Sequence, residues 1–109
     1  MAAENDNESI GQAMQLMVSA GDAKDLAHQA LTAARNGDLD LAKEKLTAAR
    51  EKLTAAHNVQ TTMLTAEAQG KTVQLTLLLV HAQDHLMTAI TYVDLAEELV
   101  ALYDRLDQK

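Results

Sequence analysis

Two histidines and an aspartate interrupt an apolar stretch near the middle of the second half of the chain. The segment VHAQDHLM, residues 80–87, follows TVQLTLLL and contains His81, Asp84 and His85. On a helix that turns about 100° per residue, Asp84 lies about 60° to one side of His81 and His85 about 40° to the other, while Gln83 points away. Because unpaired buried polar groups are costly, we expect these three side chains to perform chemistry or to fix an assembly.

A second polar group lies upstream, in the segment AHNVQT. The same helical spacing places His57, Gln60 and Thr61 on one face. If the two segments lie on antiparallel neighbouring helices, they could share one polar site. A polar layer that only fixes the register of a helical bundle is the alternative that the pattern alone leaves open.

Two metal-dependent chemistries fit the pattern poorly. HAQDH has the form of a reversed zinc-binding motif, but with Asp where Glu is expected and with no evident third ligand. A di-iron bundle needs a Glu followed three residues later by His on two helices, and the sequence contains no such pair.

The composition indicates what kind of elements must position these residues. The chain has no Pro, Cys, Trp or Phe, and it contains 2% aromatic against 48% hydrophobic residues, mainly Ala and Leu. These are the strongest helix formers, whereas a sheet protein would be richer in Val, Ile and aromatic residues. The expected fold class is therefore all-α.

Only two places look like helix breaks: NGD at residues 36–38 and QGKT at residues 69–72. The predicted helices span residues 8–35, 38–69 and 72–107. Short connections make neighbouring helices antiparallel, which gives an up-down-up three-helix bundle. Residues 1–7 are expected to be a disordered acidic N-terminus, and residues 8–109 a single domain.

The third predicted helix is apolar on nearly every side over residues 75–80. Three helices cannot surround one of their own members, so its second face is expected to pack against other copies of the chain. We therefore predict a homo-oligomer whose third helices meet near a symmetry axis.

The charge and the termini bear on partners and location. A net charge of −7 without a basic cluster argues against nucleic-acid binding. The N-terminal residues do not resemble a secretory signal, and the apolar run is too short to span a bilayer. We expect a cytoplasmic protein without direct membrane insertion.

Four segments together point to a family. LLLVHAQDHLMTA, AGDAKDLAHQAL, ARNGDLDLA and AAHNVQTTMLTAEAQG occur in an order and spacing that closely resemble the enzyme IIA components of the lactose, cellobiose and N,N'-diacetylchitobiose branch of the bacterial sugar phosphotransferase system. The resemblance runs from about Met14 to the C-terminus, and no position of the site departs from the family pattern.

The resemblance implies a role for each site residue. His81 matches the histidine that carries the phosphoryl group, on Nε2, and His57 and Gln60 match residues that line the site. Together with His85, which we also expect to line the site, they could donate to the phosphoryl oxygens across a subunit boundary. The family is trimeric, and Asp84 matches an aspartate near the threefold axis that can hold a divalent metal ion, which we expect to be structural Mg²⁺. Asp84 is not expected to be a base, because a carboxylate repels an incoming phosphoryl dianion.

The predicted protein is thus a homotrimeric phosphocarrier. It would accept phosphate from the phosphocarrier protein HPr on His81 and pass it to a IIB component, with IIC as the membrane permease, for uptake of a β-linked disaccharide. The alternative is a non-catalytic oligomerisation or adaptor module whose polar band only fixes register. The sequence does not name the sugar.

Overall fold

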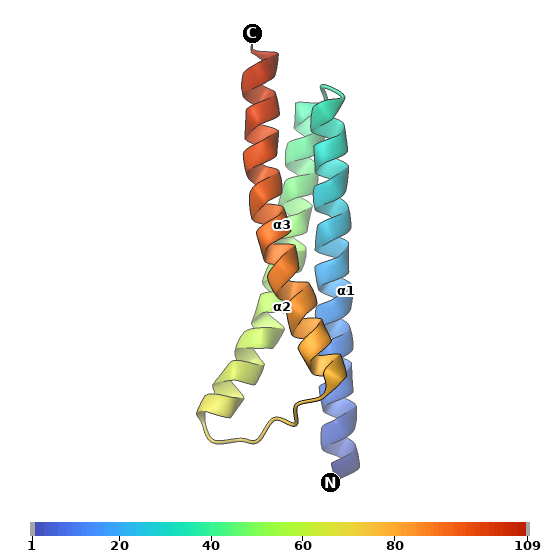
Figure 1. Cartoon of the computed structure of the whole chain (residues 1–109), viewed down its shortest axis with the longest axis vertical. Helices are drawn as coiled ribbons and strands as arrows, with labels where there is room; N and C mark the ends of the chain where they lie inside the picture. The colour runs from blue at the N-terminus through green and yellow to red at the C-terminus, as the bar shows by residue number, and fades with distance from the viewer. Residues whose placement is uncertain (1, 109) are drawn as a thin grey trace.

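Three long helices make up the computed structural model, which describes residues 2–108 and their side chains from residue 8 onward. The helices are α1 (Ala2–Arg35), α2 (Leu39–Ala68) and α3 (Leu77–Asp107). They run up, down and up in a narrow body of 61 × 21 × 19 Å, and residues 2–108 include no strand (Figure 1). The all-α, up-down-up prediction is confirmed.

A glycine turn ends each of the first two helices, as predicted. Gly37 and Gly70 both have φ of 87°, a left-handed conformation that side chains with a Cβ disfavour. At the first turn, the Asp38 N–H donates to Ala33 O and the Gly37 N–H to Ala34 O, which satisfies carbonyls at the end of α1. Asp38 then caps α2 by accepting a hydrogen bond from the Leu41 N–H.

The start of α3 differs from the prediction. The helix begins at Leu77 rather than near residue 72, and residues 71–76 form an irregular connection. Thr76 has extended backbone angles, and its hydroxyl accepts a hydrogen bond from the Leu79 N–H at 3.1 Å, so Thr76 and not Thr72 is the N-cap. Both threonines are acceptable caps. The extended connection is used to bridge the gap between the diverging ends of α2 and α3 (Figure 1).

The start of α1 also differs from the prediction, because the helix begins at Ala2 rather than near residue 8. The predicted disorder of residues 1–7 falls where no side chain is described, and it stays a prediction. The division into this segment and a single domain over residues 8–109 likewise stays a prediction.

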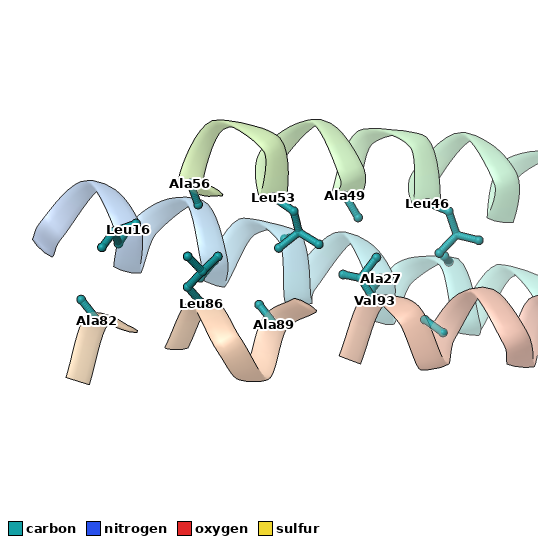
Figure 2. Packing of buried hydrophobic residues seen from close by; sticks show 14 of the residues in the cluster. Leu16, Ala27, Leu46, Ala49, Leu53, Ala56, Ala82, Leu86, Ala89 and Val93 are labelled. Atoms are coloured by element: carbon teal, nitrogen blue, oxygen red, sulfur yellow. The ribbon is translucent and has the colours of Figure 1, made fainter. Parts of the chain in front are cut away.

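Alanine dominates the interface between the helices. Leu16, Leu86 and Val93 are the largest side chains that are fully buried, and most other buried residues are alanines on the inner sides of all three helices. Figure 2 shows these side chains pointing toward a common axis. Because an alanine methyl group is small, the helix backbones approach closely, and the long helices form a thin bundle.

Apolar side chains remain exposed where α2 and α3 diverge. Leu77 is 86% exposed, Leu75 78%, Leu64 59% and Val80 53%, whereas Leu79 next to them is buried. α2 and α3 each pack along α1 and meet each other over a shorter length. The run at residues 75–80 is therefore only partly covered within one chain, which agrees with the reason for predicting an oligomer.

Candidate functional site

Helix α3 presents different residues on each of its sides. Tyr92 lies about two turns after His85, and its hydroxyl oxygen is 3.4 Å from Nδ1 of His28 on α1. Gln83 lies on the other side, where its amide oxygen accepts a hydrogen bond from Gln60 on α2. We call the side with His85 and Tyr92 the α1-facing flank, and the side with Gln83 the α2-facing flank.

His81 and His85 contact each other on the α1-facing flank. Their Nε2 atoms are 3.1 Å apart, their ring centroids are 4.5 Å apart, and the rings are nearly perpendicular at 89°. One turn of helix separates them, so the predicted proximity of the two rings follows from the spacing. One Nε2 must carry the hydrogen and the other must accept it.

The two rings differ in their exposure to solvent. His81 is exposed, whereas His85 is half-buried and its Nδ1 atom is shut off from solvent without a hydrogen-bond partner. Buried ring nitrogens usually have a partner, so this orphaned atom is unusual. The His81 ring is therefore open to solvent, and the His85 ring contacts it from a half-buried position.

Asp84 is exposed and lies on a third side of the helix. This outward stripe consists of Leu77, Val80, Asp84, Thr88, Thr91, Leu95 and Leu102, which are all exposed. The Thr88 hydroxyl donates to the carbonyl oxygens of Asp84 at 2.9 Å and His85 at 3.1 Å, and the Thr91 hydroxyl donates to Met87 O at 3.3 Å. With both hydroxyls bonded to the helix itself, the stripe is mainly apolar apart from the carboxylates of Asp84 and of the exposed Glu98, which follows Leu95 on the same side.

The α2-facing flank does not contain the predicted histidine site. The Gln60 amide donates to Gln83 Oε1 at 2.7 Å and approaches Met87 Sδ at 3.8 Å, so Gln60 is held away from His81 and His85 within one chain. His57 is exposed and lines a hollow with Arg50 and Ile90. The expectation that the second-helix residues share one polar site with His81 is therefore not met inside a single protomer.

Gln83 is the residue that the sequence pattern missed. The helical spacing predicts that Gln83 points away from His81, Asp84 and His85. It does so, and it points toward α2, where it pairs with Gln60. Ile90, one heptad later, also lies next to α2 residues, beside Arg50 and His57. This heptad relation is the signal that could have assigned Gln83 to the α2-facing flank.

An arginine links α2 to α3 further along the same flank. Arg50 Nε donates to Glu97 Oε1 at 2.6 Å, and its Nη2 donates to Asp94 Oδ1. The hydrogen bond from Arg50 holds the pKa of Glu97 below its ordinary value, and the same contacts raise the pKa of Arg50. The residue pattern does not predict this contact, because it contains no information on the register between helices.

Within residues 8–108 of one chain, no three His, Cys, Asp or Glu side chains come together in a way that could hold a metal ion. Among the helices that the structure describes, none has the length and hydropathy needed to cross a membrane.

The fold and the site define an all-α helical bundle that presents an exposed imidazole, His81, in contact with a half-buried second imidazole, His85. The chain belongs to the family described as PTS system, Lactose/Cellobiose specific IIA subunit, whose family model matches residues 11–104. It is therefore an enzyme IIA component, a phosphoryl-group carrier of the sugar phosphotransferase system. The resemblance found in the sequence is confirmed.

Individual relatives cover nearly the whole chain. The lichenan-specific phosphotransferase enzyme IIA component of Bacillus subtilis is 40% identical over 104 residues, which is 94% of each chain. The crystal structure of the cellobiose-specific enzyme IIA of Bacillus anthracis superimposes with a TM-score of 0.88 at 39% identity, covering 91% of each chain. The diacetylchitobiose IIA of Escherichia coli, solved in complex with HPr, gives a TM-score of 0.77 at 39% identity, covering 89% of this chain and 94% of that one.

Proposed function

We propose that His81 is the residue that accepts the phosphoryl group, from phospho-HPr, and that it passes the group to a IIB component. The observation that carries the assignment is the exposed His81 ring, whose Nε2 faces a second imidazole at 3.1 Å. A neutral imidazole is a good nucleophile near neutral pH, and phosphohistidine retains a high transfer potential. Family membership favours this carrier role over the non-catalytic oligomerisation module.

The relatives support the choice of partner and substrate class. The IIA of the Escherichia coli diacetylchitobiose branch was solved bound to HPr, and other relatives are named for lichenan and cellobiose. These names support uptake of a β-linked disaccharide, with IIB as the next carrier and IIC as the permease. A protein that exchanges phosphate with HPr works in the cytoplasm, where we place this chain.

We further propose that the protein works as a homotrimer in which the outward stripes of three α3 helices meet at the axis. Leu77, Leu95 and Leu102 are 86%, 57% and 51% exposed in one chain, and burying such a stripe stabilises association. The exposed positions of this part of the stripe are Thr88, Thr91, Leu95, Glu98 and Leu102, so the intervals alternate between three and four residues. This spacing suits a parallel coiled coil.

Cyclic symmetry then supports a composite site. In a closed ring, one side of each subunit contacts the opposite side of the next. The α1-facing flank with His81 and His85 would meet the α2-facing flank of a neighbour, which contains Gln60 and has His57 close by. In this arrangement His57 and Gln60 donate to the phosphoryl oxygens from the neighbouring subunit, as His85 does from the same subunit.

Asp84 fits a metal ion only in such an assembly. It is exposed on the outward stripe and has no side-chain hydrogen bond among the described residues. Three converging carboxylates repel one another, and a divalent cation that prefers oxygen ligands, such as Mg²⁺, offsets the repulsion. We propose that this ion is structural and takes no part in phosphoryl transfer.

The test is transfer from radiolabelled phosphoenolpyruvate through enzyme I and HPr. The wild-type chain should acquire an acid-labile, alkali-stable phosphate, and His81→Gln should acquire none while retaining its circular dichroism and its oligomer size. His28→Gln, a matched exposed histidine on α1, should accept phosphate at the wild-type rate. Phosphate on His81→Gln would show that another residue is the acceptor, and no phosphate on the wild-type chain would favour the non-catalytic module.

A further inference from the structure

The contact between His81 and His85 leaves one proton position undecided. The two Nε2 atoms are 3.1 Å apart, so a single hydrogen lies between them. Either His85 donates to a lone pair on His81, or His81 donates to a lone pair on His85. The two arrangements have opposite consequences, because a nitrogen that carries a hydrogen has no lone pair with which to attack phosphorus.

The buried Nδ1 atom of His85 distinguishes the two arrangements of the hydrogen. A neutral ring carries one hydrogen, so if His85 Nε2 accepts, His85 Nδ1 must be an N–H group. That atom is inaccessible to solvent and has no partner in the structure. Among buried backbone groups, orphaned N–H donors are rarer than under-satisfied acceptors. We take the same preference to hold for this ring nitrogen, and a doubly protonated ring would put a charged donor in the same place. Burial therefore favours the hydrogen on Nε2 of His85.

We infer that His85 is a positioning residue that donates its Nε2–H to Nε2 of His81 and so fixes the tautomer of the nucleophile. His81 then carries its hydrogen on Nδ1 and a lone pair on Nε2. The inference rests on the proposed function of His81 as phosphoryl acceptor. It also holds in an assembly, because His85 Nδ1 is already covered within one chain and a neighbouring subunit cannot reach it without rearrangement.

The same hydrogen bond has a second use during transfer. As the phosphoryl group arrives, the hydrogen bond from His85 to Nε2 of His81 breaks. The P–N bond of the donor phosphohistidine then breaks and its electron pair returns to the donor ring, while the freed His81 Nε2 lone pair forms the new P–N bond. The hydrogen on His81 Nδ1 stays in place, so no base is required. Since Nε2 of His81 can no longer accept, the Nε2–H of His85 is released to donate to a phosphoryl oxygen.

The direct test is the tautomeric state of both rings in the full-length protein, from long-range nitrogen–proton NMR at about pH 8.5, well above the ordinary histidine pKa of about 6.5. The expected result is an Nε2–H pattern for His85 and an Nδ1–H pattern for His81. An Nδ1–H pattern for His85 would overturn the inference. His28 serves as an internal reference on α1.

A matched pair of variants tests the role in transfer. The amide nitrogen of Gln occupies nearly the position of histidine Nε2, whereas that of Asn occupies the position of Nδ1. His85→Gln should keep the His81 tautomer and most of the rate of phosphate uptake, whereas His85→Asn should lose both, with a rate reduced on the order of 10²-fold, as expected for one positioned donor. If His85→Asn accepted phosphate as fast as His85→Gln, the inference would fail.

The failure of the inference can be separated from that of the proposed function. Phosphate uptake by His81→Gln would contradict the acceptor assignment, whatever the tautomers prove to be. Normal uptake on His81 with the opposite tautomers would contradict only the role given to His85.

Discussion

Both flanks of α3 carry polar side chains, but the two sets are used in different ways. On the α2-facing flank, Gln83 is paired with Gln60, and Arg50 is paired with Asp94 and Glu97, all within one chain. On the α1-facing flank, His85 keeps a buried nitrogen without a partner and His81 remains exposed. Polar groups satisfied inside the chain hold α2 against α3. Those left incomplete are available to a phosphoryl group and to other proteins.

The largest effect on the assembly is expected from a charge introduced on the outward stripe, next to the α1-facing flank. Leu95→Lys should dissociate the trimer, because three lysines would meet near the axis and each buried leucine contributes about 1.5–3 kcal/mol. Leu95 is 57% exposed in one chain, so the monomer should remain helical. Sedimentation velocity measures the outcome.

Leu41→Lys is the control for Leu95→Lys, because Leu41 is also partly exposed, at 38%, but lies at the start of α2. It should remain trimeric. A wild-type chain that sediments as a monomer at micromolar concentration would contradict both the trimer and the composite site.

Substitution of Asp84 should have a smaller effect of opposite sign, because it should stabilise the trimer. Asp84→Leu should abolish Mg²⁺ binding measured by calorimetry and should raise the Tm at fixed protein concentration, since it removes three repelling carboxylates and adds apolar contact. EDTA should lower the Tm of the wild type and leave that of the variant unchanged. Mg²⁺ binding by a dissociated Asp84→Leu protein would show that Asp84 is not axial.

On the α2-facing flank, a substitution should change only the stability of the protein. Arg50→Ala should lower the free energy of unfolding by about 1 kcal/mol, the upper end for exposed ion pairs, because it removes two carboxylate contacts that are partly screened by solvent. Urea unfolding at fixed protein concentration measures it. Lys43→Ala, which loses one longer contact of 3.6 Å to Asp104, should cost less. An Arg50→Ala protein as stable as the wild type would mean that the pairing with Glu97 and Asp94 does not hold α2 to α3.

The smallest expected effect is the pH dependence of the stabilisation that the contact between Arg50 and Glu97 provides. The pKa of Glu97 is lowered in the folded state from its ordinary 4.5 by the hydrogen bond from Arg50, so the stabilisation is present above that value and is lost as the pH falls through the folded pKa. Glu97→Gln should therefore reduce the unfolding free energy at pH 7 by less than about 1 kcal/mol and make progressively less difference as the pH is lowered below the ordinary 4.5. A variant whose difference from the wild type did not shrink on acidification would contradict the lowered pKa.

Much of the fold could be predicted from local patterns, because helices and their caps depend on nearby residues. Gly37 and Gly70 mark both turns, and the one-turn spacing of His81 and His85 brings their rings together. The start of α3 could not be chosen between Thr72 and Thr76, since either can cap a helix and the choice depends on the distance that the connection must span.

The candidate site could be predicted only in part. The side of α3 that faces α2 depends on how the helices are rotated about their axes, and no single-helix pattern contains that rotation. Gln60 was therefore assigned to the histidines, although within one chain it bonds to Gln83. The assignment of His57 and Gln60 to the phosphoryl site stays a prediction for the neighbouring subunit.

The alanine-rich interior has a consequence for how the helices are aligned lengthwise. A row of methyl groups is nearly smooth, so it resists separation of two helices much more than it resists sliding of one along the other. The larger buried side chains, above all the fully buried Leu16, Leu86 and Val93, must then fix the sliding position. Leu86 and Val93 lie on α3 immediately beside His85 and Tyr92, so the residues that stop α3 from slipping also set the height at which the histidines are presented.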